Sequence, residues 1–156
     1  MILCGEICNF VNVTLILLNM TNIANAQNPF FEKYTTPYGT VPFDKIKNEH
    51  YEPAIREGIS RQAAEIDAIV NNPEAPTFAN TILAYEKSGE LLDRVTTVFG
   101  NLRSAETNDD LQKIAQKMIP LLSEHSNNIS LNQELFERIK VVYLSLIHIS
   151  EPTRPI

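Results

Sequence analysis

Apolar side chains recur at helical spacing over most of the chain after residue 50. In residues 51–70 they lie three and four positions apart, at Tyr51, Ile55, Ile59, Ala63, Ile66 and Val70. Polar residues such as Arg56, Arg61 and Glu65 fall between them. This stripe predicts a helix with one buried face. Asn48 is expected to cap it, and Asn71-Asn72-Pro73 to end it, because the residue before a proline avoids the helical region.

A second helix is expected to start at Thr77, which follows Pro76 and has the side chain of a good N-cap. The apolar stripe of this segment is the longest in the chain: Phe78, Ile82, Tyr85, Leu92, Val95, Phe99 and Leu102. Gly89 and Gly100 are expected to weaken the helix by about 1 kcal/mol each relative to alanine if they are interior.

Two more helices are predicted after residue 106. Thr107 with Asp110 forms a capping-box-like start for the third, whose apolar positions are Leu111, Ile114, Ala115, Met118, Leu121 and Leu122. Pro120 cannot donate to the carbonyl of Gln116, so we expect a kink there. Asn127-Asn128 is expected to end this helix. Ser130 with Gln133 is expected to open a fourth, with apolar positions at Leu135, Ile139 and Val142.

No alternating β pattern competes with these stripes. The fold class predicted is therefore all-α, an antiparallel array of about four helices with short connections, preceded by an extended arm. The arm comprises residues 27–47, where three prolines remove amide donors and Gly39 permits a left-handed turn. Its aromatic side chains, Phe30, Phe31, Tyr34, Tyr38 and Phe43, are expected to pack against the helices or against a larger body; an aromatic peptide-binding strip is the alternative.

The first 26 residues differ from the rest, since Glu6 is their only charged residue and an apolar run extends from Phe10 to Met20. This composition predicts a secretory signal peptide, with Ala24 and Ala26 at the positions that a signal peptidase reads and cleavage before Gln27. The mature protein would then be periplasmic or secreted and would have no membrane attachment. The alternative is a cytoplasmic protein with a miscalled start. Cys4 and Cys8 both lie in this leader and are not expected to bind metal or to form a disulfide.

Residues 144–156 resemble the translation of a sequencing-library adapter, and the helical spacing gives way there to an alternating pattern. We therefore interpret residues 27–143 as the genuine helical region and the tail as an artefact; a tail strand or a frayed helix end is the alternative. His148 and Glu151 in this tail are not interpreted as an acid–base or metal pair.

Charge argues against nucleic acid as a partner. The chain has a formal net charge of -6 at pH 7, and acidic and basic residues are interspersed. Lys45 and Lys47 are the nearest approach to a basic patch, whereas phosphate binding requires a cluster of such residues.

No catalytic, cofactor-binding or metal-binding constellation is predicted in this chain. His50 and His125 each follow a glutamate in sequence, but neither has a second histidine one helical turn away. Both are interpreted as helix-end or packing residues. Glu49 and Glu52 suit a solvated first helical turn better than a carboxylate pair. Ser88-Gly89 and Gly5 do not form a phosphate loop or a nucleophile elbow.

Three ordered segments carry a family resemblance: residues 36–44 (TPYGTVPFD), 46–54 (IKNEHYEPA) and 71–82 (NNPEAPTFANTI). Together they resemble the N-terminal region of the thimet oligopeptidase and dipeptidyl carboxypeptidase family of zinc peptidases, and the dipeptidyl carboxypeptidase branch is the better match. The resemblance extends over residues 28–143. In that family pattern a glutamate usually stands where this chain has Ala79, so one helix-start contribution of roughly 0.3 to 1 kcal/mol is expected to be lacking.

The resemblance implies a zinc-dependent enzyme that removes dipeptides from the C-termini of short peptides inside a deep channel. The chemistry of the family depends on a His-Glu-x-x-His helix, which this sequence does not contain. We therefore expect an inactive N-terminal piece that binds no zinc and whose partner is the missing catalytic region. The alternative hypothesis is a stand-alone exported helical module that binds a protein through an exposed apolar face.

Overall fold

The computed structural model describes residues 28–106 and 108–150, and every regular element in these ranges is helical. The all-α prediction is therefore confirmed. The signal-peptide prediction, both cysteines, Thr107 and the last six residues lie outside the described ranges. The elements are the turns η1 (Pro29–Phe31), η2 (Pro37–Gly39) and η3 (Asn48–His50), followed by α2 (Tyr51–Val70), η4 (Phe78–Leu83), α3 (Ala84–Lys87), α4 (Glu90–Ala105), α5 (Asp109–Ser130) and α6 (Gln133–Ser150).

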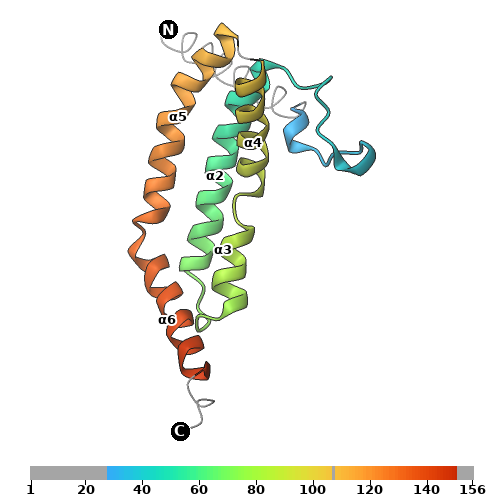
Figure 1. The fold of residues 1–156 in the computed structure, drawn as a ribbon. Helices are drawn as coiled ribbons and strands as arrows, with labels where there is room; N and C mark the ends of the chain where they lie inside the picture. The colour runs from blue at the N-terminus through green and yellow to red at the C-terminus, as the bar shows by residue number, and fades with distance from the viewer. Residues whose placement is uncertain (1–27, 107, 151–156) are drawn as a thin grey trace, which may run out of the picture.

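The helices form an elongated array with α2 at its centre (Figure 1). Helix α4 and the shorter α3 run back along one side of α2, and α5 runs along another side. Helix α6 departs from the predicted antiparallel arrangement, because it continues from the end of α5 in the same general direction. It contacts η4 and α2. None of the helices in the described part is long and apolar enough to cross a membrane.

The start of α2 differs from the predicted cap. Asn48 begins the 3-10 turn η3 instead of capping the helix. His50 caps this turn, since its imidazole Nδ1 accepts the backbone N–H of Lys47 at 3.1 Å, and α2 itself begins at Tyr51 without a side-chain cap hydrogen bond. The predicted C-terminus is correct, since α2 ends at Val70, directly before the Asn71-Asn72-Pro73 turn.

The second predicted helix is not continuous. It breaks at Gly89, which has a φ of 77° and separates α3 from α4. Glycine adopts this left-handed conformation without the steric cost that a side chain imposes. Ser88 is extended with a ψ of 145°, so two consecutive residues leave the helical region. The expectation that Gly89 merely weakens a helix was wrong. The apolar residues keep helical spacing on both sides of Gly89, so the spacing does not indicate a break.

Thr77 caps η4 as predicted, and the cap is reciprocal. The Thr77 hydroxyl accepts the amide of Asn80 at 3.1 Å, and Asn80 Oδ1 accepts the amide of Thr77 at 2.8 Å. Asn80 therefore takes the part that a glutamate or glutamine usually plays in a capping box. This partner compensates for Ala79, which supplies no polar group at the helix start.

The boundary between α5 and α6 also lies elsewhere than predicted. Helix α5 is capped by Asn108, whose side chain accepts the amide of Leu111 at 2.8 Å. It includes Pro120 without a break in the helix and passes the predicted end at residues 127–128 to reach Ser130. Asn132, not Ser130, caps α6 by accepting the amide of Leu135 at 2.9 Å. The backbone of α6 stays helical through residue 150, beyond the predicted boundary at 143.

Two separate clusters of buried side chains hold the array together. The arm-side core joins η1, α2, α4 and α5, and its buried members are Phe30, Tyr51, Ala54, Ile55, Leu92, Val95, Val98, Phe99, Leu111, Ala115 and Met118. The turn-side core joins α2 and α6 near the turn that follows α2, and its buried members are Ile66, Ile69 and Leu135. Burial of apolar surface drives both, but far more of it lies in the arm-side core.

The N-terminal arm is fixed at its base and projects at its tip (Figure 1). Phe30 is fully buried and stacks in a tilted geometry on Tyr51, with ring centroids 5.4 Å apart. Phe31 packs partly on the same core. Tyr38 and Phe43 do not pack on the helices, since they are 104% and 56% exposed. Among the aromatic side chains of the arm, the prediction of packing against the helices therefore fails for Tyr38 and Phe43, whereas the aliphatic Val41 and Ile46 do pack on the arm-side core.

Candidate functional site

His50 lies directly before α2, and its side chain accepts a hydrogen bond from the backbone. Besides its cap hydrogen bond, its Nε2 lies 4.0 Å from the Glu49 carboxylate, which is itself 72% exposed. Both residues belong to the tight 3-10 turn η3, which places the two side chains this close. The helix-end interpretation of His50 is confirmed.

His125 lies on the buried face of α5, where its imidazole Nε2 is 2.9 Å from Gln62 Oε1 on α2. The ring therefore donates to the amide oxygen and links the two helices. Burial lowers the pKa of His125 below its ordinary value of 6.5, because a charged imidazole loses solvation there. These contacts confirm a packing role. The partner Gln62 could not be inferred from sequence, since it lies 63 residues away.

The two glutamates at the start of α2 do not form a carboxylate pair. Glu52 binds Arg56 at 3.1 Å on its own helix and Lys117 at 2.6 Å on α5. The hydrogen bond from Lys117 is the main reason that the pKa of Glu52 lies below its ordinary value of 4.5. Glu49 instead lies 3.8 Å from Lys47. Glu52 is thus an interhelical ion-pair residue and shows no sign of acid–base function.

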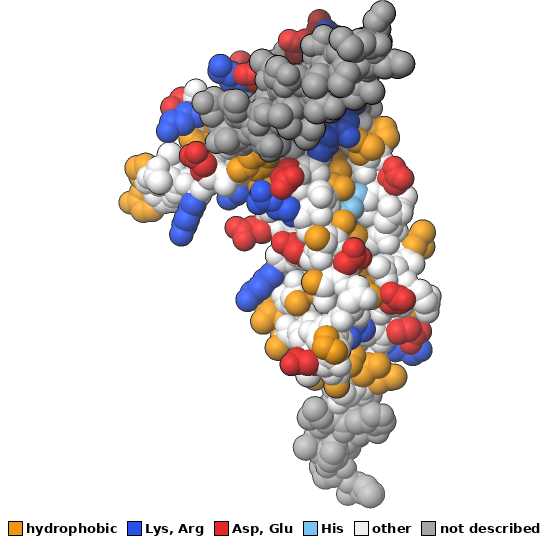
Figure 2. Space-filling view, turned by 180° about the vertical axis from the view of Figure 1, so that it is seen from behind, with side chains coloured by type: hydrophobic (Ala, Val, Ile, Leu, Met, Phe, Trp, Pro, Cys, Tyr) orange, Lys and Arg blue, Asp and Glu red, His pale blue; other side chains and the backbone are white. Residues whose placement is uncertain are grey.

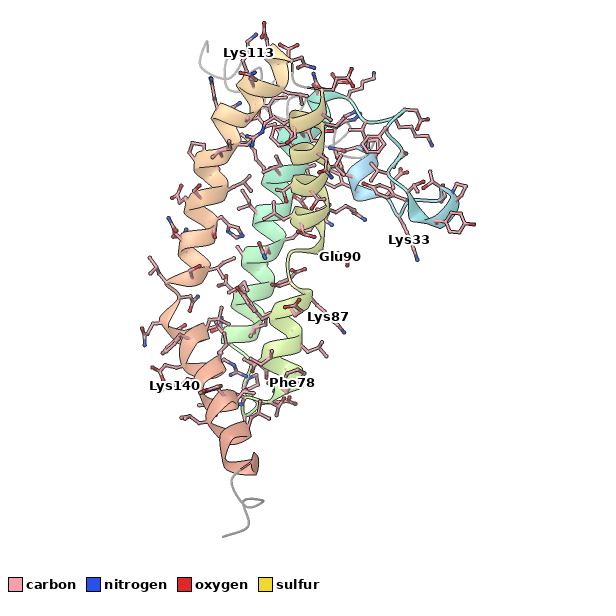
Figure 3. The ribbon with its side chains drawn as sticks, in the orientation of Figure 1. Lys33, Phe78, Lys87, Glu90, Lys113 and Lys140 are labelled. Carbon is pink, nitrogen blue, oxygen red and sulfur yellow. The ribbon has the colours of Figure 1, made fainter. Side chains whose placement is uncertain are left out.

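Ser88 and Gly89 occur at the α3–α4 break and form neither a phosphate loop nor a nucleophile elbow. The Ser88 hydroxyl donates to the Tyr85 carbonyl at 2.7 Å, and the Gly89 amide donates to Glu65 Oε2 on α2 at 2.7 Å. The Gly89 amide is therefore already paired with a carboxylate, whose negative charge would repel a phosphate. Figure 3 shows Lys87 and Glu90 on the two sides of the break.

A surface hollow of about 820 Å³ lies at this break. Its lining combines acidic and basic side chains with backbone from the break: Gln62, Glu86, Lys87, Ser88, Gly89, Glu90, Leu92, Asp93, Thr96 and Leu122. Among the side chains that the structure describes, no group of three His, Cys, Asp or Glu residues could hold a metal ion.

The most distinctive surface feature is exposed apolar area. It gathers on η4, α3 and α6 and at the arm tip, and its most exposed large members are Tyr38, Phe43, Phe78, Leu131, Phe136, Val141, Tyr143 and Leu146. Figure 2 shows such side chains as separate patches at the arm and toward the end occupied by α6. Figure 3 places Phe78 at this α6 end. Exposed apolar patches of this kind are typical of surfaces that contact another polypeptide.

One surface contact holds the turn after α2 in place. Arg138 on α6 donates to the carbonyl oxygens of Asn72 at 2.8 Å and Glu74 at 3.2 Å. The rigid turn of the 71–82 segment is thus fixed by a residue 66 positions from Asn72. Sequence reasoning missed Arg138, because nothing in its local pattern distinguishes it from a solvated helix residue.

Comparisons with known proteins point to one group of enzymes. The chain is 50% identical over 116 residues to the dipeptidyl carboxypeptidase of Escherichia coli (strain K12), and 47% identical over 116 residues to that of Salmonella typhimurium. Each match covers 74% of this chain but only 17% of the relative's length. Oligopeptidase A of Haemophilus influenzae is 29% identical over 113 residues, which cover 72% of this chain and 16% of that protein.

No family model matches the chain. The identities nevertheless extend over most of the residues that the structure describes. Over this segment, the chain is a homologue of the dipeptidyl carboxypeptidases, with oligopeptidase A as a more distant relative.

Proposed function

We propose that this chain is the N-terminal helical segment of a zinc-dependent peptidyl-dipeptidase that hydrolyses short peptides. The observation that carries the proposal is the 50% identity over 116 residues to a dipeptidyl carboxypeptidase, of which those residues are 17%. In this proposal the helices form part of the wall around a channel that admits short, unfolded peptides. The catalytic residues belong to another part of the polypeptide.

The described residues do not fit a catalytic zinc ion. Such a site needs about three protein ligands that converge on one point. His50 and His125 lie on different elements and are engaged with Lys47 and Gln62. We therefore assign no step of peptide hydrolysis to this segment and propose that the zinc ligands lie elsewhere.

The exposed apolar side chains support a role as a packing unit. Phe78 and Phe136 are 56% and 55% exposed, and Tyr143 is 62% exposed. Phe136 and Tyr143 lie on α6, the helix that carries Leu135 of the turn-side core, and Phe78 lies on η4, which contacts α6. The turn-side core itself has few buried members. A segment that packs on a larger body would bury such side chains and gain the stability that its small core does not supply.

A chimera tests this proposal directly. Residues 28–143 of this chain replace the matching segment of the Escherichia coli dipeptidyl carboxypeptidase, and release of C-terminal dipeptides from a short peptide is measured. We expect the chimera to hydrolyse the peptide and this chain alone to show no hydrolysis, with or without added zinc. The E. coli enzyme is the positive control, and the chimera with Tyr51→Ala is the matched disrupted variant.

Two results would contradict the proposal. Chelator-sensitive hydrolysis by this chain alone would show that it carries its own active site. An unfolded, inactive chimera would show that the segment does not take the place of its homologue.

The second candidate is a stand-alone helical module that binds a protein partner through the same exposed side chains. It predicts that the isolated chain is a monodisperse monomer that unfolds cooperatively, whereas a segment without its body should self-associate. Analytical ultracentrifugation with calorimetry separates the two. Resequencing the gene across the codon for Tyr143 gives an independent answer, since the peptidase proposal requires a His-Glu-x-x-His motif downstream.

A further inference from the structure

The tip of the N-terminal arm combines full exposure with an unfavourable backbone conformation. Tyr38 is 104% exposed and has a φ of 60°, and Gly39 follows it with a φ of 66°. Among the described residues other than glycine, Tyr38 is the one with a positive φ. A bulky side chain in this region costs about 1–3 kcal/mol and persists only where the surroundings enforce it.

Local hydrogen bonds enforce this conformation. The Gly39 amide donates to the Thr36 carbonyl at 3.0 Å, and the Thr40 hydroxyl donates to the Pro37 carbonyl at 3.1 Å. The Thr36 hydroxyl donates to the Thr40 carbonyl, which closes the loop across the turn. Tyr38 is therefore presented by an ordered loop.

The base of the arm is equally well fixed. Asn28 is buried and donates from Nδ2 to the His50 carbonyl at 2.9 Å. Arg94 donates to the Phe30 carbonyl at 2.6 Å, and its guanidinium lies 5.1 Å from the centre of the Tyr34 ring. The arm thus holds its outer turn η2 away from the helices (Figure 1).

The chemistry of the tip indicates a protein contact. Residues 34–43 contain no charged side chain, and they include Tyr38, three threonines after Tyr34 and the half-exposed Phe43. The central part of protein interfaces is depleted in charge and enriched in aromatic residues, and tyrosine is among the common anchors. An uncharged tip offers nothing to the phosphates of a nucleic acid or an anionic membrane.

We propose that Tyr38 and its loop dock into an apolar pocket on the catalytic part of the same polypeptide. This inference rests on the proposed function. The matched residues account for only 17% of the relatives' length, so most of such a protein would lie outside this segment and could cover the tip. Because the loop is already ordered, docking loses little conformational entropy, which favours an anchor of this kind.

The test is solvent reactivity of Tyr38. Hydroxyl-radical oxidation followed by mass spectrometry is applied to the full 156-residue chain and to the active chimera described above. We expect oxidation of Tyr38 to be at least tenfold slower in the chimera than in the isolated chain, with the urea-unfolded chimera as the reference for full reactivity. Equal rates in the folded chimera and the isolated chain would overturn the inference.

Substitutions give a second measurement. Asparagine tolerates the left-handed conformation but has no ring, so Tyr38→Asn should leave the melting temperature of the isolated chain unchanged or raised. In the chimera it should shorten the half-life of activity at elevated temperature at least fivefold. Tyr38→Phe keeps the ring, and Lys33→Ala alters a charged neighbour on the same arm (Figure 3); both should stay within twofold of the parent chimera.

The outcomes separate this inference from the proposed function. An active chimera in which Tyr38 stays reactive and Tyr38→Asn has no effect refutes the docking and leaves the proposed function intact. An inactive, unfolded chimera refutes both. Protection of Tyr38 that grows with the concentration of the isolated chain identifies a second copy as the occupant, and this result also overturns the inference.

Discussion

The two ends of the helical array are stabilised in different ways. The arm-side core has eleven buried apolar residues from four elements, and the turn-side core has three from two. The turn-side end adds polar contacts instead: the Thr77–Asn80 cap, the Asn132 cap and the Arg138 hydrogen bonds. The arm-side end therefore depends on packing, and the turn-side end depends on local geometry and on surface that is still free to pack.

A polar seam separates the two cores. Gln62 and Glu65 on α2 contact His125 and Gly89, on α5 and at the α3–α4 break. Hydrogen bonds contribute less net stability than apolar burial of similar extent, but they fix which residues face each other. The seam thus sets the register between α2 and its neighbours.

The largest effect is expected in the arm-side core. Tyr51 is 1% exposed and contacts the rings of Phe30 and Phe99, with centroids 5.4 and 5.1 Å away. Tyr51→Ala should lower the free energy of unfolding by about 3–5 kcal/mol, as for other large aromatic truncations. Urea unfolding followed by circular dichroism measures it. Tyr51→Phe should be nearly neutral, because the hydroxyl has no hydrogen-bond partner among the described residues; equal losses for both variants would contradict the packing explanation.

A smaller loss is expected in the turn-side core. Leu135 is 3% exposed, but its cluster is small and can collapse around a cavity. Leu135→Ala should lower the free energy of unfolding by about 2–3 kcal/mol, near the low end for such truncations. The neighbouring Phe136→Ala is the control, since Phe136 is 55% exposed and should change stability by less than about 0.5 kcal/mol. If Leu135→Ala cost more than Tyr51→Ala, the contrast between the two ends would be wrong.

Two glycine substitutions should change the free energy of unfolding in opposite directions: one at Gly89, in the polar seam, and one at Gly100, inside α4. A Cβ at Gly89 would lie 2.3 Å from Gln62 Nε2, and the φ of 77° is unfavourable for alanine. Gly89→Ala should therefore cost about 1–2 kcal/mol. Gly100 lies inside α4 with open space around it, so Gly100→Ala should stabilise by about 0.5–1 kcal/mol. Thermal unfolding of both variants checks the prediction, and matching signs would refute it.

The cap of η4 should contribute less. Thr77→Ala removes one hydrogen bond of the reciprocal pair with Asn80 and should cost about 1 kcal/mol. A double-mutant cycle with Asn80→Ala measures the coupling between the two side chains. Additive losses would show that the two hydrogen bonds act independently.

The smallest effect is a pH dependence from His125. Because burial lowers the pKa of His125, the unfolded chain binds a proton more readily than the folded one below pH 6.5. The contribution of neutral His125 to the free energy of unfolding is therefore complete above pH 6.5. It is lost as the pH falls from 6.5 through the lowered pKa of the folded state. His125→Asn should reduce the decrease in melting temperature between pH 7 and pH 5.5. Glu52, whose pKa lies below 4.5, should add its own loss only at more acidic pH.

Apolar spacing predicted which faces are buried better than where elements begin and end. Tyr51, Leu92 and Val142 are buried as their stripes indicate. The break at Gly89 was missed because a stripe can resume in phase after a left-handed residue. The start of α6 was misplaced because Ser130 and Asn132 are both good caps, and the choice between them depends on how α6 packs against α2 and η4.

The long-range polar contacts could not be predicted from a single sequence. Three of these hydrogen bonds join residues that are far apart in the sequence: Glu65 with Gly89, 24 positions apart; Gln62 with His125, 63 apart; and Arg138 with Asn72, 66 apart. Each requires the helices to be placed in three dimensions first. Glu49 and Glu52 do not form a carboxylate pair, but the expected solvated first turn missed the ion pair between Glu52 and Lys117, which is 65 positions away.

The Arg138 contact sets an order of events during synthesis. The turn at residues 72–74 receives its two hydrogen bonds from a side chain that leaves the ribosome 66 residues after Asn72. At a synthesis rate of about 5–20 residues per second, that interval lasts several seconds. Met118, the last buried member of the arm-side core, is made before Arg138, so the turn-side end receives its last contacts later than the arm-side end.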